Sequence, residues 1–179
     1  MIKVLIILIL FMLSGPAYSL DFFSPGIPSG TKIRKDYVMN HDGCKGKNLS
    51  PELRWNTPPA GVKSYAVSVY DLDAPGGWWH WLIYDIPANV TRLPVNSGYS
   101  ENGIGPFGTH EGINDYGTYG WGGPCPPAGD LPHHYLFTLY ALGIKKLPLP
   151  SESKIEDIIP LIKKDSIDSI SFTAYYGRK

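Results

Sequence analysis

Turn-forming residues interrupt this sequence so often that a helical bundle is an unfavourable outcome. The 179 residues include 20 glycines and 17 prolines, which favour many turns and short strands. The length is enough for one domain with a sizeable core and too short to expect two. Hydrophobic residues make up 43% and charged residues 18%, so the chain should be globular rather than disordered.

Several segments carry the patterns that are typical of strands. Ser64–Tyr70 alternates with a period near two, and His134–Leu142 has the clearest long strand pattern. Trp81–Ile86 is mostly apolar and ends before a proline, which predicts a buried strand. Leu53–Trp55 and Ile170–Tyr176 are weaker candidates. A long stretch between residues 96 and 129 shows no such pattern, and a loop of this length is usually functional or mobile.

One helix is predicted near the C-terminus, at Ser153–Lys164. Ser153 and Glu156 form an S-x-x-E capping box at its start. Isoleucines give it one apolar face: Ile155, Ile158, Ile159 and Ile162. Pro160 removes a hydrogen bond in mid-helix, so the helix should be kinked there or start again at that residue. Strands dominate and this helix is peripheral, which predicts an all-β fold, an antiparallel β-sandwich.

The N-terminus has the pattern of a signal peptide covering residues 1–19. Lys3 supplies a positive charge and Val4–Leu13 is an apolar run of ten residues, "VLIILILFML". The tripeptide at 17–19, Ala-Tyr-Ser, puts small residues at the −3 and −1 positions of a cleavage site. A membrane anchor is the alternative, but a bilayer span needs roughly 20 apolar residues. We therefore expect a periplasmic or secreted protein in which residues 20–179 form a single domain.

Cys44 and Cys125 are the two cysteines of the chain. In an exported chain an even number of cysteines predicts one disulfide between them. Two free thiols or a pair of metal ligands are the alternatives. The sequence has no C-x-x-C motif, which makes a zinc site the weakest of the three.

Two proline-bearing loops each lead into an apolar strand and each place a histidine where that strand begins. In "DLDAPGGWWHWLIYD", at Asp71–Asp85, His80 precedes the apolar run. In "GPCPPAGDLPHHY", at Gly123–Tyr135, His133 precedes the other one. Strand entrances on the same edge of a sheet can converge, and Asp71 ends the strand before His80. The sequence therefore predicts a small polar pocket with aromatic and proline walls, which is the usual make-up of a ligand site.

Each of these residues also has an ordinary structural interpretation. Asp71 and Asp73 suit a turn, since Asp-Ala-Pro-Gly-Gly is a good turn sequence. His80 is explained equally well as a core histidine bonded to a backbone carbonyl. His133 and His134 point to opposite faces of a strand, so at most one of them faces the pocket. The joint arrangement of the residues favours a site, and no single residue does so alone.

These motifs resemble those of the phosphatidylethanolamine-binding protein family, and more closely those of its bacterial Raf-kinase-inhibitor-like branch. Besides "DLDAP", "WWHW" and "GPCPPAGDLPHHY", the likeness includes "NLSPELRWNTPPAG" at 48–61 and "NDYGTYGWGGPCPP" at 114–127. It covers most of residues 45–178. Two positions depart from the family's pattern, because Leu72 replaces a proline between the two acids and His134 replaces an arginine. The first change loosens the loop slightly, and the second removes a fixed charge.

The resemblance implies an antiparallel β-sandwich with a small anion pocket near its surface. Matched residue by residue, the pocket would use Asp71, Trp78, His80, Pro127, His133 and Tyr135. Either Tyr175 or Tyr176 would close one side. In the family such pockets hold phosphate-like or carboxylate groups, including the head group of phosphatidylethanolamine. Imidazole N–H groups and a tyrosine O–H would donate to the anion. Asp71 would either orient a histidine and stabilise its imidazolium form, or a proton would be shared with the anion.

The leading functional hypothesis is a non-catalytic protein that binds a small anion or a phosphorylated group. Some relatives modulate partner enzymes, but no feature of this sequence identifies a protein partner. No cofactor is expected, and sixteen basic residues balance sixteen acidic ones, which gives no indication of nucleic acid. A hydrolase that uses the histidines and aspartates for acid–base catalysis is the alternative, although no G-x-S-x-G motif is present. A metal site formed by His80, His133 and Asp71 is weaker still, because the spacings match no standard signature.

Overall fold

The computed structural model describes residues 19–57, 60–149 and 152–179 of the chain. Apart from Ser19, the expected signal peptide lies outside these described residues. The apolar run that could instead be a membrane anchor, Val4–Leu13, lies outside them as well. Within them, no helix is both long enough and apolar enough to cross a membrane.

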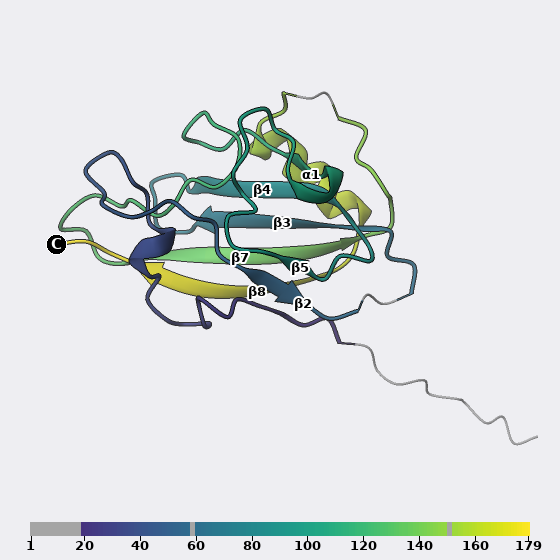
Figure 1. The fold of residues 1–179 in the computed structure, drawn as a ribbon, viewed down its shortest axis with the longest axis horizontal. Helices are drawn as coiled ribbons and strands as arrows, with labels where there is room; N and C mark the ends of the chain where they lie inside the picture. The colour runs from purple at the N-terminus through teal and green to yellow at the C-terminus, as the bar shows by residue number, and fades with distance from the viewer. Residues whose placement is uncertain (1–18, 58–59, 150–151) are drawn as a thin grey trace, which may run out of the picture.

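The strands form two antiparallel sheets, as the sequence predicts (Figure 1). The larger sheet has the order β6-β4-β3-β7-β8, with bounds His110–Glu111, Trp78–Pro87, Ser64–Asp71, His133–Leu142 and Ser166–Tyr176. The smaller sheet has the order β1-β2-β5, with bounds Phe22–Phe23, Leu53–Trp55 and Arg92–Leu93. Figure 1 shows β4, β3, β7 and β8 side by side, with β2 and β5 crossing one face of them.

The larger sheet is covered on both faces, and this explains the composition of its central strands. On β4, Trp81 and Ile83 pack in the core between the two sheets. The alternate residues Leu82 and Tyr84 pack in a second cluster with helix α1, Ile155–Asp165. A strand that is buried on both faces has no solvent side, so its sequence is continuously apolar rather than alternating. Each fully buried large apolar side chain stabilises the fold by roughly 1.5–3 kcal/mol.

Helix α1 forms where the isoleucine pattern predicts it, and all four isoleucines of the predicted apolar face are buried. Of the two outcomes predicted at Pro160, a restart is not found: the helix runs through this residue, because packing of its apolar face outweighs one lost hydrogen bond. The predicted capping box is wrong. The N-cap is Lys154 rather than Ser153, so the predicted capping box does not mark the first residue of the helix.

The long segment between β5 and β7 is more ordered than its composition predicts. It contains the short 3₁₀ helix η2, Pro106–Gly108, as well as strand β6. Its middle is fixed by Asn114, whose side-chain oxygen accepts hydrogen bonds from the backbone N–H groups of Tyr116 and Thr118. A second short 3₁₀ helix, η1, spans Lys35–Tyr37 near the N-terminal end of the described chain. The segment after β6 reaches the end of the larger sheet, where β3 finishes and β4 and β7 begin.

Candidate functional site

A cavity of about 300 Å³ lies where β3 ends and where β4 and β7 begin, and we call it the candidate pocket. The residues that line it are Asp71, Ala74, Pro75, Trp78, His80, Tyr116, Cys125, Pro126, Pro127 and His133. All of the predicted site residues except Tyr135 are therefore among its walls. Neither Tyr175 nor Tyr176 lines it, so the predicted closure by a C-terminal tyrosine is not found.

The register of the sheet brings the two sequence motifs together. Asp71 pairs with Trp78 on β4 and with Tyr135 on β7, so the ends of both motifs meet at the last residue of β3. The loop between β3 and β4 turns back through Gly76 and Gly77, which have φ values of 79° and 78°. Only glycine adopts this backbone region without strain. At Gly77 a Cβ would also lie 1.5 Å from the hydroxyl oxygen of Tyr70, so a side chain at this position requires the Tyr70 ring to move.

Asp71 is 3% exposed, and both of its carboxylate oxygens are engaged. Oδ1 accepts hydrogen bonds from the backbone N–H groups of Asp73 and Ala74, at 2.9 and 3.2 Å. Oδ2 lies 2.7 Å from Nδ1 of His133. An ionised carboxylate can only accept, so Nδ1 of His133 carries a proton. The residue that the sequence suggests as a turn residue thus also orients the pocket histidine.

The second ring nitrogen of His133 is directed away from Asp71. Nε2 lies 3.7 Å from the carboxylate of Asp130, which is too far for a hydrogen bond. His133 is buried, whereas its neighbour His134 is exposed on the other face of β7. The expectation that only one of these two histidines faces the pocket is therefore met by the geometry.

His80 is both a buried histidine bonded to a carbonyl and a wall of the pocket. Its Nδ1 donates a hydrogen bond to the carbonyl oxygen of Gly122 at 2.5 Å. Burial lowers the pKa of His80 to about 4, against the opposing effects of this hydrogen bond and of the Asp71 carboxylate. The ring is therefore neutral at pH 7, and Nε2 has no proton to donate. No described residue bonds to Nε2, which leaves an acceptor available to the pocket.

Aromatic rings surround this pair of histidines. Trp78 and Tyr116 make an edge-to-face contact with ring centroids 5.4 Å apart. The Tyr116 hydroxyl donates to the carbonyl oxygen of Gly123, and burial raises the pKa of Tyr116, so the phenol stays uncharged. Tyr116 is not among the site residues predicted from the sequence. The only signal was its position within "NDYGTYGWGGPCPP", at 114–127.

Tyr135 lies behind the pocket rather than in its wall. Its ring packs against His80 with centroids 5.1 Å apart, and the side chain is fully buried. Its hydroxyl makes no hydrogen bond of good geometry with any described residue. Burial, and then the nearby Asp71 carboxylate, raises the pKa of Tyr135.

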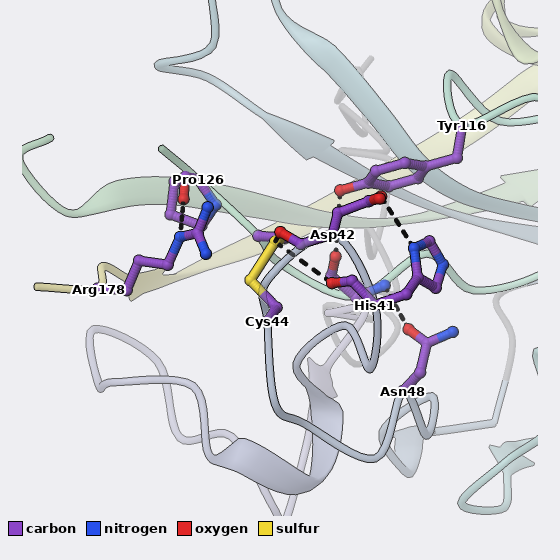
Figure 2. Close-up of a disulfide and its surroundings, with 9 residues drawn as sticks. His41, Asp42, Cys44, Asn48, Tyr116, Pro126 and Arg178 are labelled. Carbon is purple, nitrogen blue, oxygen red and sulfur yellow. Dashed lines mark hydrogen bonds and ion pairs between the residues drawn. A yellow bond between two sulfur atoms is a disulfide. The ribbon is translucent and has the colours of Figure 1, made fainter. Parts of the chain in front are cut away.

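A disulfide joins Cys44 to Cys125, which are 81 positions apart and whose Cα atoms are 6.0 Å apart. This is the pairing that the sequence predicts, and its Cys125 forms part of the pocket wall. In Figure 2, Pro126 and Arg178 lie on one side of the disulfide and Tyr116 on the other. Nε of Arg178 donates to the carbonyl oxygen of Pro126 at 2.6 Å. The proline loop of the pocket is thus held both by the disulfide and by the C-terminal segment.

The two departures from the family pattern leave the loop intact. Asp73 accepts hydrogen bonds from the backbone N–H of His134 at 2.5 Å and from its Nδ1 at 2.9 Å. The backbone hydrogen bond is the largest cause of a lowered pKa of Asp73. Leu72 is 50% exposed, and its backbone N–H donates to the carbonyl oxygen of His134 at 2.9 Å. His134 therefore gives Asp73 a partner, and the backbone hydrogen bonds hold the loop without a proline at position 72.

The chemistry that the pocket offers is that of a binding site with titratable groups. Among the described residues, no three His, Cys, Asp or Glu side chains gather as they would around a metal ion. The described lining contains no serine, threonine or lysine, and its cysteine is in the disulfide. What remains is a carboxylate–imidazole pair, a second imidazole and apolar walls.

Comparison with known proteins gives consistent matches. A sequence model described as phosphatidylethanolamine-binding protein matches residues 24–177. The UPF0098 protein YbcL of Escherichia coli K12 is 41% identical over 168 residues, which are 93% of this chain and 92% of YbcL. A Mycobacterium tuberculosis relative, LppC, is described as a lipoprotein and is 40% identical over 135 residues, or 75% of this chain and 60% of LppC.

Solved structures agree with the sequence matches. The crystal structure of E. coli YbcL, described as a new member of the mammalian PEBP family, has a TM-score of 0.84 at 42% identity. The alignment covers 89% of this chain and 99% of that one. The PEBP homologue CT736 of Chlamydia trachomatis has a TM-score of 0.76 at 26% identity, covering 91% and 100% of the two chains.

Proposed function

The chain belongs to the phosphatidylethanolamine-binding protein family, and on that premise we propose that it is a non-catalytic binding protein for a small phosphate-like anion. Members of this family are generally binding proteins rather than enzymes. The observation that carries the proposal is the buried pair of Asp71 and His133, whose second imidazole nitrogen makes no hydrogen bond to a described residue and lies within aromatic walls. A phosphate-like group, alone or on a phosphorylated head group, is small enough for a cavity of about 300 Å³.

Binding of an anion here requires a proton as well. The Asp71 carboxylate would repel an anion in the same small cavity. A proton on Nε2 of His133 turns that ring into a cation that donates to the anion while Nδ1 still donates to Asp71. His80 offers a second place for a proton at its own Nε2. A hydrogen phosphate has a further option, because its hydroxyl can donate to the unprotonated Nε2 of His80.

The proton taken up by a pocket imidazole determines how anion affinity changes with pH. A bound anion favours the protonated form of a neighbouring imidazole, so it raises that group's pKa. For His80 the pKa starts from about 4, and the free protein is therefore unprotonated at this site above pH 6. Binding takes up a proton, and affinity rises as the pH falls from about 8 to about 6.

A hydrolase is the competing function, since Asp71 and His133 have the geometry of an acid–base pair. The described lining contains no serine, threonine or free thiol, which argues against a covalent mechanism that uses one of these nucleophiles. Assays with a panel of phosphoester and ester substrates separate the two hypotheses. Turnover that disappears in His80→Ala would establish the hydrolase, whereas binding without turnover supports the proposal.

We also propose that the protein is exported, to the periplasm or to the medium. A disulfide between Cys44 and Cys125 persists in an oxidising compartment and is rare in a reducing cytosol. The description of the M. tuberculosis relative as a lipoprotein points in the same direction. A partner enzyme, if this protein has one, would then be met outside the cytoplasm.

The direct test compares two adjacent histidines. Calorimetric titration with inorganic phosphate at pH 6 should show binding to the wild type and to His134→Ala, since His134 lies outside the pocket. His133→Ala should weaken binding by about tenfold or more, the size expected for a charge-assisted hydrogen bond. His133→Gln, which keeps a donor toward Asp71, checks that the loss is not caused by misfolding. Equal affinities in the two alanine variants would refute the proposed site.

A further inference from the structure

A groove of about 550 Å³ lies beside the candidate pocket, and its lining is strongly basic. Its residues are Lys32, Lys35, Gly43, Cys44, Lys45, Tyr176, Gly177, Arg178 and Lys179, which we call the basic groove. Five of them have basic side chains and none has an acidic side chain. The whole chain has sixteen basic and sixteen acidic residues, so this local excess is a matter of placement rather than composition.

The side chains of the basic groove form no ion pair with the part of the chain that the structure describes. None of its lysines, nor Arg178, is within 4.0 Å of a carboxylate among the described residues. The nearby acid Asp36 is engaged by Arg34 and Lys47, each at 2.8 Å. Cations that repel one another without compensation do not stabilise a fold, and they attract anions.

Two of the cations are held in position. The ammonium group of Lys32 lies 5.7 Å from the ring centroid of Tyr176, a distance at which the ring face attracts a cation. Arg178 is fixed by its hydrogen bond to the carbonyl oxygen of Pro126. Its Nη1 passes so close to Gly43 that a Cβ there would lie 3.3 Å away. The charged groups of Lys32 and Arg178 therefore have defined positions in the groove.

The basic groove and the candidate pocket share a wall. Cys44 lines the groove, and Cys125, to which it is bonded, lines the pocket. Arg178 makes a second connection, since it lines the groove while it donates to Pro126 of the pocket (Figure 2). The disulfide is thus the wall that separates a ligand in the candidate pocket from the positively charged side chains of the basic groove.

We propose that the ligand of this protein carries two anionic groups, one of which enters the candidate pocket while the other is held by the basic groove. This inference rests on the proposed function, because it assigns the first anionic group to the pocket. The chemical class is a small bis-anion such as a bisphosphate. A zwitterionic head group would bring an ammonium group toward the cations of the groove and would be disfavoured.

The test uses methylphosphonate and a series of alkane bisphosphonates of increasing chain length, titrated by calorimetry at pH 6. Methylphosphonate reports the pocket alone. The affinity of the best bisphosphonate should exceed that of methylphosphonate by about tenfold or more. This is the gain expected from one further charge-assisted contact, because the second group of a linked ligand binds without a second loss of translational and rotational freedom. The gain should peak at one chain length, because linkers that are too short or too long fail to satisfy both sites.

Matched variants separate the groove from general charge attraction. Lys35→Ala/Lys45→Ala should reduce the bisphosphonate affinity to nearly that of methylphosphonate and leave methylphosphonate binding unchanged. Lys63→Ala/Lys145→Ala removes the same charge from a different groove and should change neither. A gain that persists in the first variant, or that falls equally in both, overturns the inference while the pocket proposal stands. If methylphosphonate does not bind the wild type at all, the proposed function fails and the two-point ligand fails with it.

Discussion

Glu111 gives the sharpest stability prediction, because it is an acid buried within the core beside tryptophans. It is 2% exposed on β6, and its Oε1 accepts a hydrogen bond from Nε1 of Trp81 at 2.9 Å. Its other oxygen is buried without a hydrogen bond of good geometry to any described residue. Burial raises the pKa of Glu111 from 4.5 to about 7, against the lowering effect of the Trp81 hydrogen bond.

The sign and size of the effect follow from linkage. A carboxyl whose pKa is raised on folding is stabilised in its protonated form, and this contribution is lost as the pH rises from the unfolded pKa of 4.5 through about 7. A shift of about 2.5 units corresponds to about 3 kcal/mol. Glu111→Gln keeps an acceptor for Trp81 and cannot ionise. Relative to the wild type, it should be more stable by about 3 kcal/mol at pH 8 and by about 1 kcal/mol or less at pH 5.

The assay is urea unfolding of both proteins at pH 5 and pH 8, followed by tryptophan fluorescence. The free energy of unfolding of the wild type should fall over this range relative to that of Glu111→Gln. A difference between the two proteins that is the same at both pH values would show that Glu111 does not titrate as described. Glu101→Gln, at an exposed position, is the matched control and should not reproduce the effect.

Three further predictions concern the framework of the site. Replacing Cys44 and Cys125 by serine should lower the free energy of unfolding by about 4 kcal/mol, the chain-entropy value for a loop of this length, and an unchanged urea midpoint would contradict it. Gly77→Ala should destabilise by about 1 kcal/mol more than Gly76→Ala, since both positions have positive φ but only a Cβ at Gly77 displaces the Tyr70 ring; equal melting temperatures would refute this. Mass spectrometry of the exported protein should give an N-terminus at Leu20, and an uncleaved chain would favour the membrane anchor.

The fold was largely predictable because its strongest determinants are local. The continuous apolar run of β4 and the isoleucine spacing of α1 both report burial directly. Helix details were not predictable, since the passage of α1 through Pro160 depends on packing against the larger sheet. The register that brings β3 against both β4 and β7 also depends on contacts between distant segments.

The candidate site was predictable as a set of motifs rather than as a geometry. Asp71 and His133 were identified from their positions at strand ends, and their pairing fits the expected orienting role. The state of His80 depends on its burial and on the carbonyl of Gly122, which no sequence pattern encodes. Tyr116 was missed because its place in the wall is set by side-chain hydrogen bonds within a long loop.

Calorimetric titration of phosphate at pH 6 and pH 8 tests the central claim most directly, namely that the candidate pocket binds an anion together with a proton. The account predicts tighter binding at pH 6, by up to about 100-fold if one proton is taken up across the whole range. Sulfate, which takes up no proton in this range, should show the same direction if an imidazole holds the proton. Absence of binding at both pH values, or an affinity that is equal or higher at pH 8, would contradict the account.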